Sequence, residues 1–364
     1  MRQIKELPSM DAIQNLVREN IRNMAAYAVA DVPASFVKLD AMELPYRFPE
    51  DLRRELAAEL AEAQINRYPN PAACGLQPLL RTTFDIPEAA RIVLGNGSDE
   101  LIQLLTMLLA KPGAKMLAPE PGFVMYRHNA ALFGMEYVGV PLNPDFTLNL
   151  DAMLAAIETH RPALVFLACP NNPTGVPFSR EDVQAVIDAA PGVVVVDEAY
   201  GAFSGGSFLP QAGGAEKLVV LRTLSKIGFA GLRLGYACCH PAPAAELAKI
   251  VPPYNMNQLS LTAAKFALRH YGWVAEKIDI LKRERARLAQ ELAALPDVRV
   301  FPSEANFLTA RVPDAASVFD TLKANGILIK KLHGAHPLLE GCLRFTVGTP
   351  EQNRQVLAVL KTVF

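Results

Sequence analysis

Residues 163–200 read ALVFLACPNNPTGVPFSREDVQAVIDAAPGVVVVDEAY, and this segment decides the fold. It contains two short apolar runs, LVFLA at 164–168 and VVVV at 193–196, which turn residues bound and which predict β-strands. Between them, SREDVQAVIDAA at 179–190 has the pattern of a helix. The order of strand, helix and strand predicts a βαβ unit with parallel strands. Because neither strand alternates with polar residues, we expect a sheet that helices cover on both faces.

The same alternation extends from about residue 91 to residue 225. Further strands are predicted at RIVLGNG (91–97), AKMLAPEPG (114–122), MEYVGVPL (135–142) and KLVVLRTLS (217–225). Helical patterns lie between them at SDELIQLLTMLLA (98–110), VMYRHNAALFG (124–134) and NLDAMLAAIETH (149–160). The sequence therefore predicts an α/β fold whose large domain contains a mainly parallel sheet flanked by helices.

A second domain is expected after Pro252 and Pro253. A long helical stretch at 257–295 leads into short strands and helices that continue to the C-terminus. The predicted organisation is an N-terminal arm at 1–37 that packs with the small domain, a large ligand-binding domain at 38–250, and a small α/β domain at 251–364.

Charge and composition narrow the classes of function. The chain has 364 residues, of which 51% are hydrophobic, and 36 Lys and Arg against 37 Asp and Glu give a net charge of −1. A neutral chain has no general attraction for nucleic acid or an anionic membrane, so neither is an expected partner. No apolar run reaches the roughly 18 residues that span a bilayer, and the N-terminus lacks a signal-peptide core. We therefore expect a cytoplasmic protein.

The cysteines and histidines show no metal-binding spacing. The five cysteines are odd in number and form no C-x-x-C pair, which favours reduced thiols in the core. The six histidines form no H-x-x-x-H or H-x-x-E-H pattern. We expect no metal site.

Four polar motifs follow or end predicted strands: GNGSDE at 95–100, PNNPTG at 170–175, DEAY at 197–200 and TLSK at 223–226. Parallel sheets bind ligands at the carboxyl ends of their strands, so these motifs are expected to converge in space. Each motif alone also has an ordinary structural explanation. The four would then be a helix N-cap, a proline turn, a strand-end carboxylate and a surface turn with solvated cations.

One ligand accounts for all four motifs together. A lysine whose pKa is lowered by burial can attack an aldehyde to form a Schiff base, and Lys226 is the candidate. Asp197, at the end of an apolar strand, suits a protonated ring nitrogen. Asn172 and Tyr200 are expected at a ring hydroxyl. The expected phosphate-binding set consists of backbone N–H groups of Ser98, Asp99 and Glu100 together with the side chains of Thr223, Ser225 and Arg233. These functions indicate pyridoxal 5'-phosphate.

These motifs also resemble those of a known family. NNPTG at 171–175, DEAY at 197–200 and SKIGFAGLRLGY at 225–236 resemble the fold-type I pyridoxal-phosphate-dependent aminotransferases. VKLDAMELPY at 37–46, EPGFVMY at 120–126 and HPLLEGCLRFTVGTPEQN at 336–353 are most similar to the histidinol-phosphate branch of that family. The resemblance implies a homodimer with an active site at the subunit interface. It also implies transamination between histidinol phosphate and 2-oxoglutarate, in histidine biosynthesis.

Further site residues are implied by the resemblance alone. Phe123 takes the position of the aromatic ring that stacks on the cofactor, and Tyr68 that of a tyrosine reaching the cofactor phosphate of the neighbouring subunit. Arg344 matches the arginine that forks onto the substrate anion. Lys331 lies near a second cation for the substrate phosphate, and Tyr27 near an aromatic that meets the imidazole.

Two positions depart from the family pattern. Leu44 stands where relatives usually have Asn before the Pro, and Arg233 follows Lys226 by seven residues where many relatives have eight. Leu44 puts a loop contact in doubt, whereas the shorter spacing moves a glycine-rich turn and keeps the arginine.

The expected catalytic residues are Lys226, Asp197 and Tyr200. Lys226 moves the α-proton, while Asp197 keeps the ring nitrogen protonated. An aromatic amino-acid aminotransferase and a phosphothreonine decarboxylase of the same fold remain alternatives, because the sequence does not determine the side-chain pocket or which bond breaks. A cofactor-binding regulator is a third, disfavoured by the neutral charge and the lack of a DNA-binding extension. Arg222 has no role in this scheme and stays unexplained, with a surface charge at a strand end as its simplest interpretation.

Overall fold

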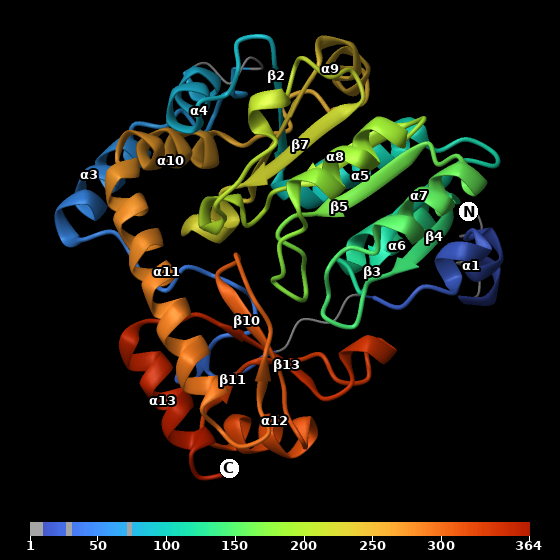
Figure 1. Cartoon of the computed structure of the whole chain (residues 1–364). Helices are drawn as coiled ribbons and strands as arrows, with labels where there is room; N and C mark the ends of the chain where they lie inside the picture. The colour runs from blue at the N-terminus through green and yellow to red at the C-terminus, as the bar shows by residue number, and fades with distance from the viewer. Residues whose placement is uncertain (1–9, 27–30, 71–74) are drawn as a thin grey trace, which may run out of the picture.

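The computed structural model describes residues 10–26, 31–70 and 75–364. Its larger part is built on a seven-stranded sheet with the order β2-β8-β7-β6-β5-β3-β4 (Figure 1). The strands are β2 (Arg91–Asn96), β3 (Lys115–Glu120), β4 (Glu136–Pro141), β5 (Leu164–Ala168), β6 (Val193–Asp197), β7 (Leu218–Thr223) and β8 (Leu234–Cys239). Strand β8 runs antiparallel to both of its neighbours, and the other neighbouring pairs are parallel. The predicted mainly parallel sheet is confirmed.

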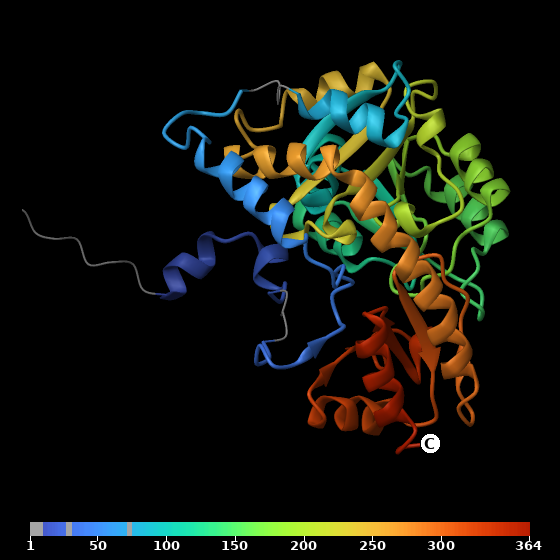
Figure 2. The ribbon, with the colours of Figure 1, turned by 90° about the vertical axis from the view of Figure 1, so that its left-hand side faces the viewer.

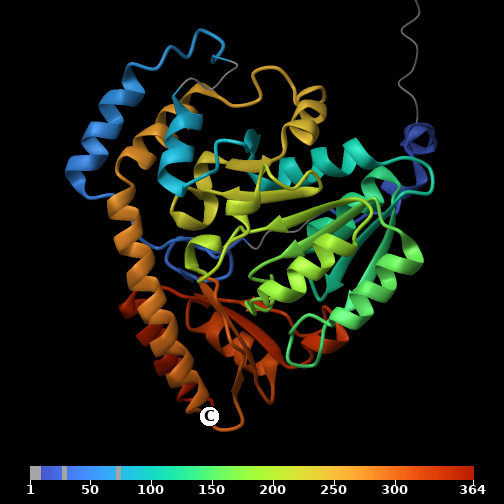
Figure 3. The ribbon, with the colours of Figure 1, turned by 45° about the horizontal axis from the view of Figure 1, so that its top comes forward.

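Helices cover both faces of this sheet (Figures 1 and 3). One face carries α5 (Gly97–Leu109), α6 (Val124–Phe133) and α9 (Pro241–Ala248), and the other carries α7 (Leu150–His160) and α8 (Arg180–Ala189). Strand β6 shows why its sequence is apolar throughout. Val195 packs into the first layer, whereas Val194 and Val196 pack into the second, and all three are fully buried.

A four-stranded antiparallel sheet, with the order β12-β13-β10-β9, forms the smaller part of the molecule. Its strands are β9 (Arg299–Val300), β10 (Phe307–Arg311), β12 (Lys330–Lys331) and β13 (Cys342–Thr346). The helices α11 (Tyr271–Ala293), α12 (Ala315–Ala324) and α13 (Pro350–Leu360) cover one face. Leu343 and Phe345 point into that helical layer, so the alternation of β13 turns Arg344 toward the larger sheet.

Helix α11 runs along both parts of the molecule (Figure 1). The preceding helix, α10 (Gln258–Arg269), packs against α3 (Glu50–Ala61) and α4 (Leu76–Phe84), beside the larger sheet. The predicted boundary after residue 250 therefore assigns α10 to the small domain although its contacts lie with the larger part, and the domain limits stay a prediction. Within the described residues, five short 3-10 helices complete the elements: η1 (Gly201–Phe203), η2 (Leu209–Gln211), η3 (Ser225–Ile227), η4 (Ala230–Leu232) and η5 (Pro337–Leu339).

The N-terminal segment contacts both parts of the molecule (Figure 2). Helices α1 (Met10–Leu16) and α2 (Glu19–Arg22) come first, and Asn20 Nδ2 donates to the carbonyl of Ala131 on α6 at 2.6 Å. Strand β1 (Val37–Lys38) then pairs in parallel with β11 (Ile327–Leu328). Among the described helices, none is long and apolar enough to cross a membrane.

Residues 40–42 continue from β1 to the space between the two sheets. Met42 has a left-handed backbone, with φ of 55°. Its N–H donates to Thr346 Oγ1 at 3.1 Å, and its carbonyl accepts from Asn306 Nδ2 at 2.9 Å. These two bonds to the smaller part hold a backbone conformation that is unfavourable for a residue other than glycine.

Candidate active site

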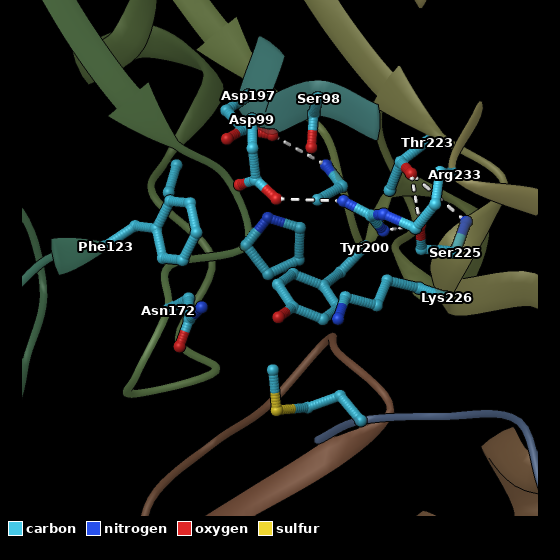
Figure 4. Close-up of a pocket in the computed structure, with 14 residues that line it drawn as sticks. Ser98, Asp99, Phe123, Asn172, Asp197, Tyr200, Thr223, Ser225, Lys226 and Arg233 are labelled. Atoms are coloured by element: carbon cyan, nitrogen blue, oxygen red, sulfur yellow. Dashed lines mark hydrogen bonds and ion pairs between the residues drawn. The ribbon is translucent and has the colours of Figure 1, made fainter. Parts of the chain in front are cut away.

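The four polar motifs meet in one cavity at the carboxyl ends of the parallel strands (Figure 4). The cavity encloses about 550 Å³ of empty space, part of it open to solvent. Its lining residues are Met42, Ser98, Asp99, Phe123, Ala168, Pro170, Asn172, Asp197, Ala199, Tyr200, Thr223, Ser225, Lys226 and Arg233. Ten of the sequence-predicted site residues are in this set, which leaves Glu100, Tyr68, Arg344, Lys331 and Tyr27 to be located elsewhere.

One end of the cavity is a cradle for an anion. Thr223 Oγ1 lies 2.9 Å from Ser225 Oγ, and Arg233 Nη1 donates to Ser225 Oγ at 3.4 Å. Beside them lies the first turn of α5, where the N–H groups of Gly97 to Asp99 have no partner within the helix. A cation, two hydroxyls and a helix N-terminus together bind a phosphate or carboxylate.

Two glycines bring these groups close together. A Cβ atom at Gly235 would lie 2.4 Å from the backbone nitrogen of Ser98, so only glycine lets β8 approach the start of α5. A Cβ atom at Gly97 would lie 2.6 Å from Arg233 Nη2. Gly97 and Gly235 therefore allow the Arg233 guanidinium to lie against the N-terminus of α5.

The two acids of GNGSDE lie differently. Asp99 borders the cavity and pairs with Arg233 Nη2 at 3.2 Å, while both side chains stay about half exposed. Glu100 turns back and accepts from the backbone N–H of Asn96 at 2.7 Å. Its carboxylate therefore does not face the cradle, and its N–H is the first to bond within the helix. The phosphate-binding role predicted for Glu100 has weaker geometric support than those of Ser98 and Asp99.

Lys226 enters the cavity from η3. Its Nζ donates to the carbonyl of Ala41 at 3.2 Å and lies 6.0 Å from the centre of the Tyr200 ring. Burial lowers the pKa of the Lys226 amine to about 8, and the nearby Arg344 guanidinium acts in the same direction. The amine can thus lose its proton near neutral pH, as a nucleophile or general base must.

Asp197 is a buried carboxylate at the end of β6. Its Oδ2 accepts from the Tyr126 hydroxyl at 2.8 Å, and its Oδ1 accepts from the N–H of Ala199 at 3.0 Å. Burial raises the pKa of the Asp197 carboxyl to about 6, although both hydrogen bonds oppose that rise. A cation in the cavity would stabilise the ionised form.

Tyr126 is a site residue that the sequence analysis missed. Its ring is fully buried and stacks on Phe166 with centroids 4.4 Å apart, and burial raises the pKa of its hydroxyl. The hydroxyl stays protonated and holds Asp197 in place. Tyr126 lies in the predicted helix at 124–134, and no local pattern links it to Asp197, 71 residues later.

Arg222, which the sequence left unexplained, is not a surface charge. Arg222 is 14% exposed and donates from Nε at 3.0 Å and from Nη2 at 2.7 Å to Glu198 Oε2, and Glu198 is 2% exposed. The Glu198 carboxylate also accepts from Ser207 Oγ and from the N–H of Phe208. Strands β6 and β7 are neighbours, so the residues that end them can form a buried ion pair beside the cavity.

Substituting Arg222 by methionine is expected to destabilise the fold by about 3–5 kcal/mol, because the Glu198 carboxylate would lose its cation in a buried site. Urea denaturation measures this loss. The double substitution Arg222→Met with Glu198→Gln removes both charges and is expected to recover most of the stability. The exposed pair of Arg54 and Glu50 offers a control, in which Arg54→Met should change stability by less than about 1 kcal/mol.

A second cleft adjoins the cavity and shares Met42, Phe123 and Asn172 with it. Arg344 lies at this junction, almost fully buried. Its Nη1 donates to Asn172 Oδ1 at 2.7 Å, and its Nη2 donates to the carbonyl of Asp40 at 2.9 Å. The arginine implied by the resemblance thus borders the space next to the proposed cofactor cavity.

Lys331 lies on the wrong face of its strand to join Arg344. The register of β12 and β13 pairs Lys330 with Arg344 and Lys331 with Leu343, and directly paired residues point to the same face. The Lys331 ammonium lies 5.4 Å from the centre of the Phe319 ring on α12, which fits this assignment. Both lysines border the cleft, but Lys330 is the one that shares a face with Arg344.

The other residues implied by the resemblance lie outside the cavity or outside the described structure. Tyr68 is 80% exposed and stacks on Tyr254 with centroids 4.6 Å apart. Tyr27 lies outside the described residues. Leu44, the departure from the family pattern, is buried, and a Cβ at Gly228 would lie 3.2 Å from its side chain, so it packs against the turn after Lys226.

Comparison with known proteins gives the family. Residues 34–360 match the family model described as aminotransferase class I and II. The chain belongs to the class I and II aminotransferases. This aminotransferase is 62% identical to the histidinol-phosphate aminotransferase of Neisseria gonorrhoeae over 98% of its own length and 100% of the relative's. It is 56% identical to that of Chromobacterium violaceum over 97% and 99%. The family and the branch expected from the motifs are confirmed.

Solved structures agree with the fold. The histidinol-phosphate aminotransferase of Sinorhizobium meliloti in complex with pyridoxal-5'-phosphate superposes with a TM-score of 0.81. The match covers 90% of this aminotransferase and 92% of that chain, at 24% identity. At that identity the likeness shows the fold, which is the predicted fold-type I architecture.

Proposed function

We propose that this chain transfers the amino group of L-histidinol phosphate to 2-oxoglutarate, giving imidazole acetol phosphate and L-glutamate in histidine biosynthesis. The relatives from Neisseria gonorrhoeae and Chromobacterium violaceum carry the corresponding name. The observation that carries the proposal is the arrangement of Lys226, Asp197 and the anion cradle around one cavity, with Arg344 at its border.

Pyridoxal 5'-phosphate fits this cavity. Its phosphate suits Thr223, Ser225, Arg233 and the first turn of α5, and its ring nitrogen suits the buried Asp197 carboxylate. Phe123 and Tyr200 offer ring contacts, Asn172 an amide, and Lys226 an amine for the aldehyde. When bound, the cofactor supplies an electrophilic carbon and a ring that accepts electrons from the bond that breaks.

The protein's own groups divide the remaining work. Lys226, with its lowered pKa, is suited to take the α-proton of the substrate and to deliver a proton to the cofactor carbon that carried the aldehyde. Asp197 keeps its charge opposite the protonated ring nitrogen. Arg344 holds the substrate anion, since its planar fork suits both the phosphate of histidinol phosphate and the α-carboxylate of glutamate.

We also propose that two copies share the active site and that the enzyme works in the cytoplasm. Tyr68, Ile65, Tyr254 and Leu259 are all between 44% and 80% exposed, which is unusual for large apolar side chains and suits a partner's surface. Tyr68 would then reach the neighbouring cavity. Light scattering should give a molar mass of twice 39.6 kDa, and a mass of one chain would contradict the dimer.

Half-reactions test the assignment of substrate. The cofactor-loaded enzyme is mixed separately with histidinol phosphate, phenylalanine and phosphothreonine, and the absorbance of the cofactor is followed together with release of CO₂. We expect rapid conversion of the cofactor to its amine form with histidinol phosphate and no CO₂ with phosphothreonine. Turnover of phenylalanine alone would show an aromatic aminotransferase instead, and CO₂ release would show a decarboxylase.

Lys330, rather than Lys331, is predicted to bind the substrate phosphate together with Arg344. Lys330→Ala should raise the KM for histidinol phosphate about tenfold, since a charge-assisted hydrogen bond is lost. Lys331→Ala should change it by less than about twofold, because its ammonium lies over Phe319. The two variants remove the same charge from adjacent positions, so equal effects on KM would contradict the assignment from register.

A further inference from the structure

The cleft that begins at Arg344 ends at a group of polar residues in the larger part of the molecule. Glu120 ends β3, Arg127 lies on α6 and Tyr137 lies on β4, and all three line the cleft. The described lining contains five basic side chains, those of Arg127, Lys330, Lys331, His336 and Arg344, whereas Glu120 is its one carboxylate. A mostly cationic cleft suits anionic substrates, so the position of this single acid needs a reason.

Arg127 and Tyr137 hold Glu120 in place. Arg127 donates from Nη2 at 2.6 Å and from Nε at 3.1 Å to Glu120 Oε1. The Arg127 guanidinium lies 4.4 Å above the Tyr137 ring, which restricts its orientation. Burial raises the pKa of the Tyr137 hydroxyl, and Glu120 raises it further through charge and hydrogen bonding. The tyrosine therefore stays protonated beside the carboxylate.

A glycine makes room for the carboxylate. A Cβ atom at Gly139 would lie 2.4 Å from Glu120 Oε2, so any other residue at this position of β4 would displace Glu120 from the sheet surface. Glu120 is 21% exposed and Arg127 is 61% exposed. The acid is thus set into the wall of the cleft while its arginine partner remains accessible from solvent.

The spacing along α6 relates this group to the cofactor cavity. Phe123, the residue expected at the cofactor ring, is the N-cap of α6, and Arg127 follows four residues later. Four residues of helix advance about 6 Å, which is one turn. Phe123, Glu120, Arg127 and Arg344 line the same cleft, so it offers a substrate held by Arg344 beside Phe123 a path toward Glu120 and Arg127.

We propose that Glu120 and Arg127 form the subsite for the distal group of both substrates, with Glu120 accepting from the imidazole of histidinol phosphate and Arg127 donating to the γ-carboxylate of glutamate. This inference rests on the proposed function, because it assumes those two substrates. It explains how one site accepts side chains of unlike chemistry without exchanging its residues.

The hydrogen-bonding capacity of the pair allows both uses. An imidazole N–H needs an acceptor, and the carboxylate of Glu120 has lone pairs left after its bonds to Arg127. A γ-carboxylate needs donors, and a guanidinium has five N–H groups. Glu120 accepts from Nε and Nη2 of Arg127, which leaves the Nη1 group of the guanidinium outside this pair. Arg127 can then bridge two carboxylates and offset their repulsion.

The opposing interpretation is a surface ion pair that only stabilises the fold. Exposed pairs of this kind contribute little and would influence both substrates equally. The ring beneath Arg127 and the glycine beside Glu120 argue for a fixed geometry facing the cleft. Kinetics with two substrates separate the two interpretations, because only a subsite discriminates between distal groups.

The test compares Arg127→Gln and Glu120→Gln in both half-reactions. Arg127→Gln should lower kcat/KM for glutamate at least about tenfold and change that for histidinol phosphate much less. Glu120→Gln should lower kcat/KM for histidinol phosphate by a similar factor and change kcat/KM for glutamate by less than about threefold. Arg354→Gln, which breaks the exposed pair with Glu351 on α13, is the matched control and should affect neither substrate.

The outcomes distinguish this inference from the proposed function. Equal losses for both substrates in each variant, or no loss in either, would overturn the subsite. Thermal unfolding of each variant shows whether an equal loss reflects a damaged fold. In that case Arg127→Lys, which keeps the charge, decides between the interpretations. A fall in kcat/KM for glutamate alone supports the subsite, and equal values for both substrates reject it. If the unmodified enzyme does not convert histidinol phosphate, the proposed function fails, whereas a loss of glutamate turnover in Arg127→Gln that is absent in the Arg354→Gln control would still support the role of Arg127.

Discussion

Replacing Lys226 by alanine is expected to lower kcat by about four orders of magnitude, the upper range for loss of a general acid–base group. The amine lies inside the cavity, and its pKa of about 8 lets it act in both the protonated and the neutral form. Arginine at this position is expected to be equally inactive, because a guanidinium does not release its proton at these pH values. Steady-state rates with both substrates provide the measurement.

Lys217 provides a matched control for Lys226. It lies just before the opposite end of β7, where its Nζ donates to the carbonyl of Ala190 at 3.0 Å, outside the cavity. Lys217→Ala should retain full activity. Covalent attachment supplies a second measurement, since borohydride reduction of the cofactor-loaded enzyme should add the cofactor mass to the peptide containing Lys226. A Lys226→Ala enzyme that keeps more than about a tenth of the activity would refute the assignment.

Asp197→Asn is expected to have opposite effects on activity and on stability. The activity should fall about 100-fold or more, because an amide does not hold a positive charge on the ring nitrogen. The local structure should survive, since an asparagine oxygen can accept from Ala199 while its amide donates to the Tyr126 hydroxyl. The loss of activity would then report the lost charge and not a displaced side chain.

The same substitution should stabilise the cofactor-free protein. A pKa of about 6 in the fold, against an unfolded value near 3.8, means that the ionised Asp197 costs about 3 kcal/mol at pH 8. This cost is absent below about pH 4 and develops as the pH rises through 6, because the folded state holds the proton more tightly than the unfolded chain does. Urea denaturation of both proteins at pH 4 and pH 8 measures it.

Equal stabilities at pH 8 would contradict the raised pKa of Asp197. Asp320→Asn serves as a control, since Asp320 is exposed on α12 and its loss should leave both activity and stability within the range of ordinary surface substitutions, about 0.5 kcal/mol. The comparison separates the effect of a buried charge from that of removing any carboxylate.

Sequence periodicity was sufficient to predict the sheet and the place where the four polar motifs meet. Strands such as Val193–Asp197 are apolar throughout, and the alternation with helices leaves few arrangements other than a parallel sheet. Once the sheet is parallel, residues at the carboxyl ends of neighbouring strands must lie near one another. The convergence of Asn172, Asp197 and Lys226 therefore required no knowledge of individual contacts.

Pairings between distant residues could not be predicted in this way. Whether Arg222 meets Glu198 depends on which strands are neighbours, and the choice between Lys330 and Lys331 depends on the register of a two-residue strand. Tyr126 depends on the packing of α6 against the sheet. Each of these facts follows from tertiary geometry, and a single sequence carries no local signal for it.

The short segment at residues 40–42 also determines a distance that matters for the reaction. Arg344 comes from the smaller sheet and Lys226 from the larger one, yet they donate to the carbonyls of adjacent residues, Asp40 and Ala41. Consecutive Cα atoms are separated by about 3.8 Å whatever the two sheets do. Because Met42 anchors the segment to the smaller sheet, the peptide acts as a spacer. It links the residue that binds the substrate anion directly to the residue that carries the proton.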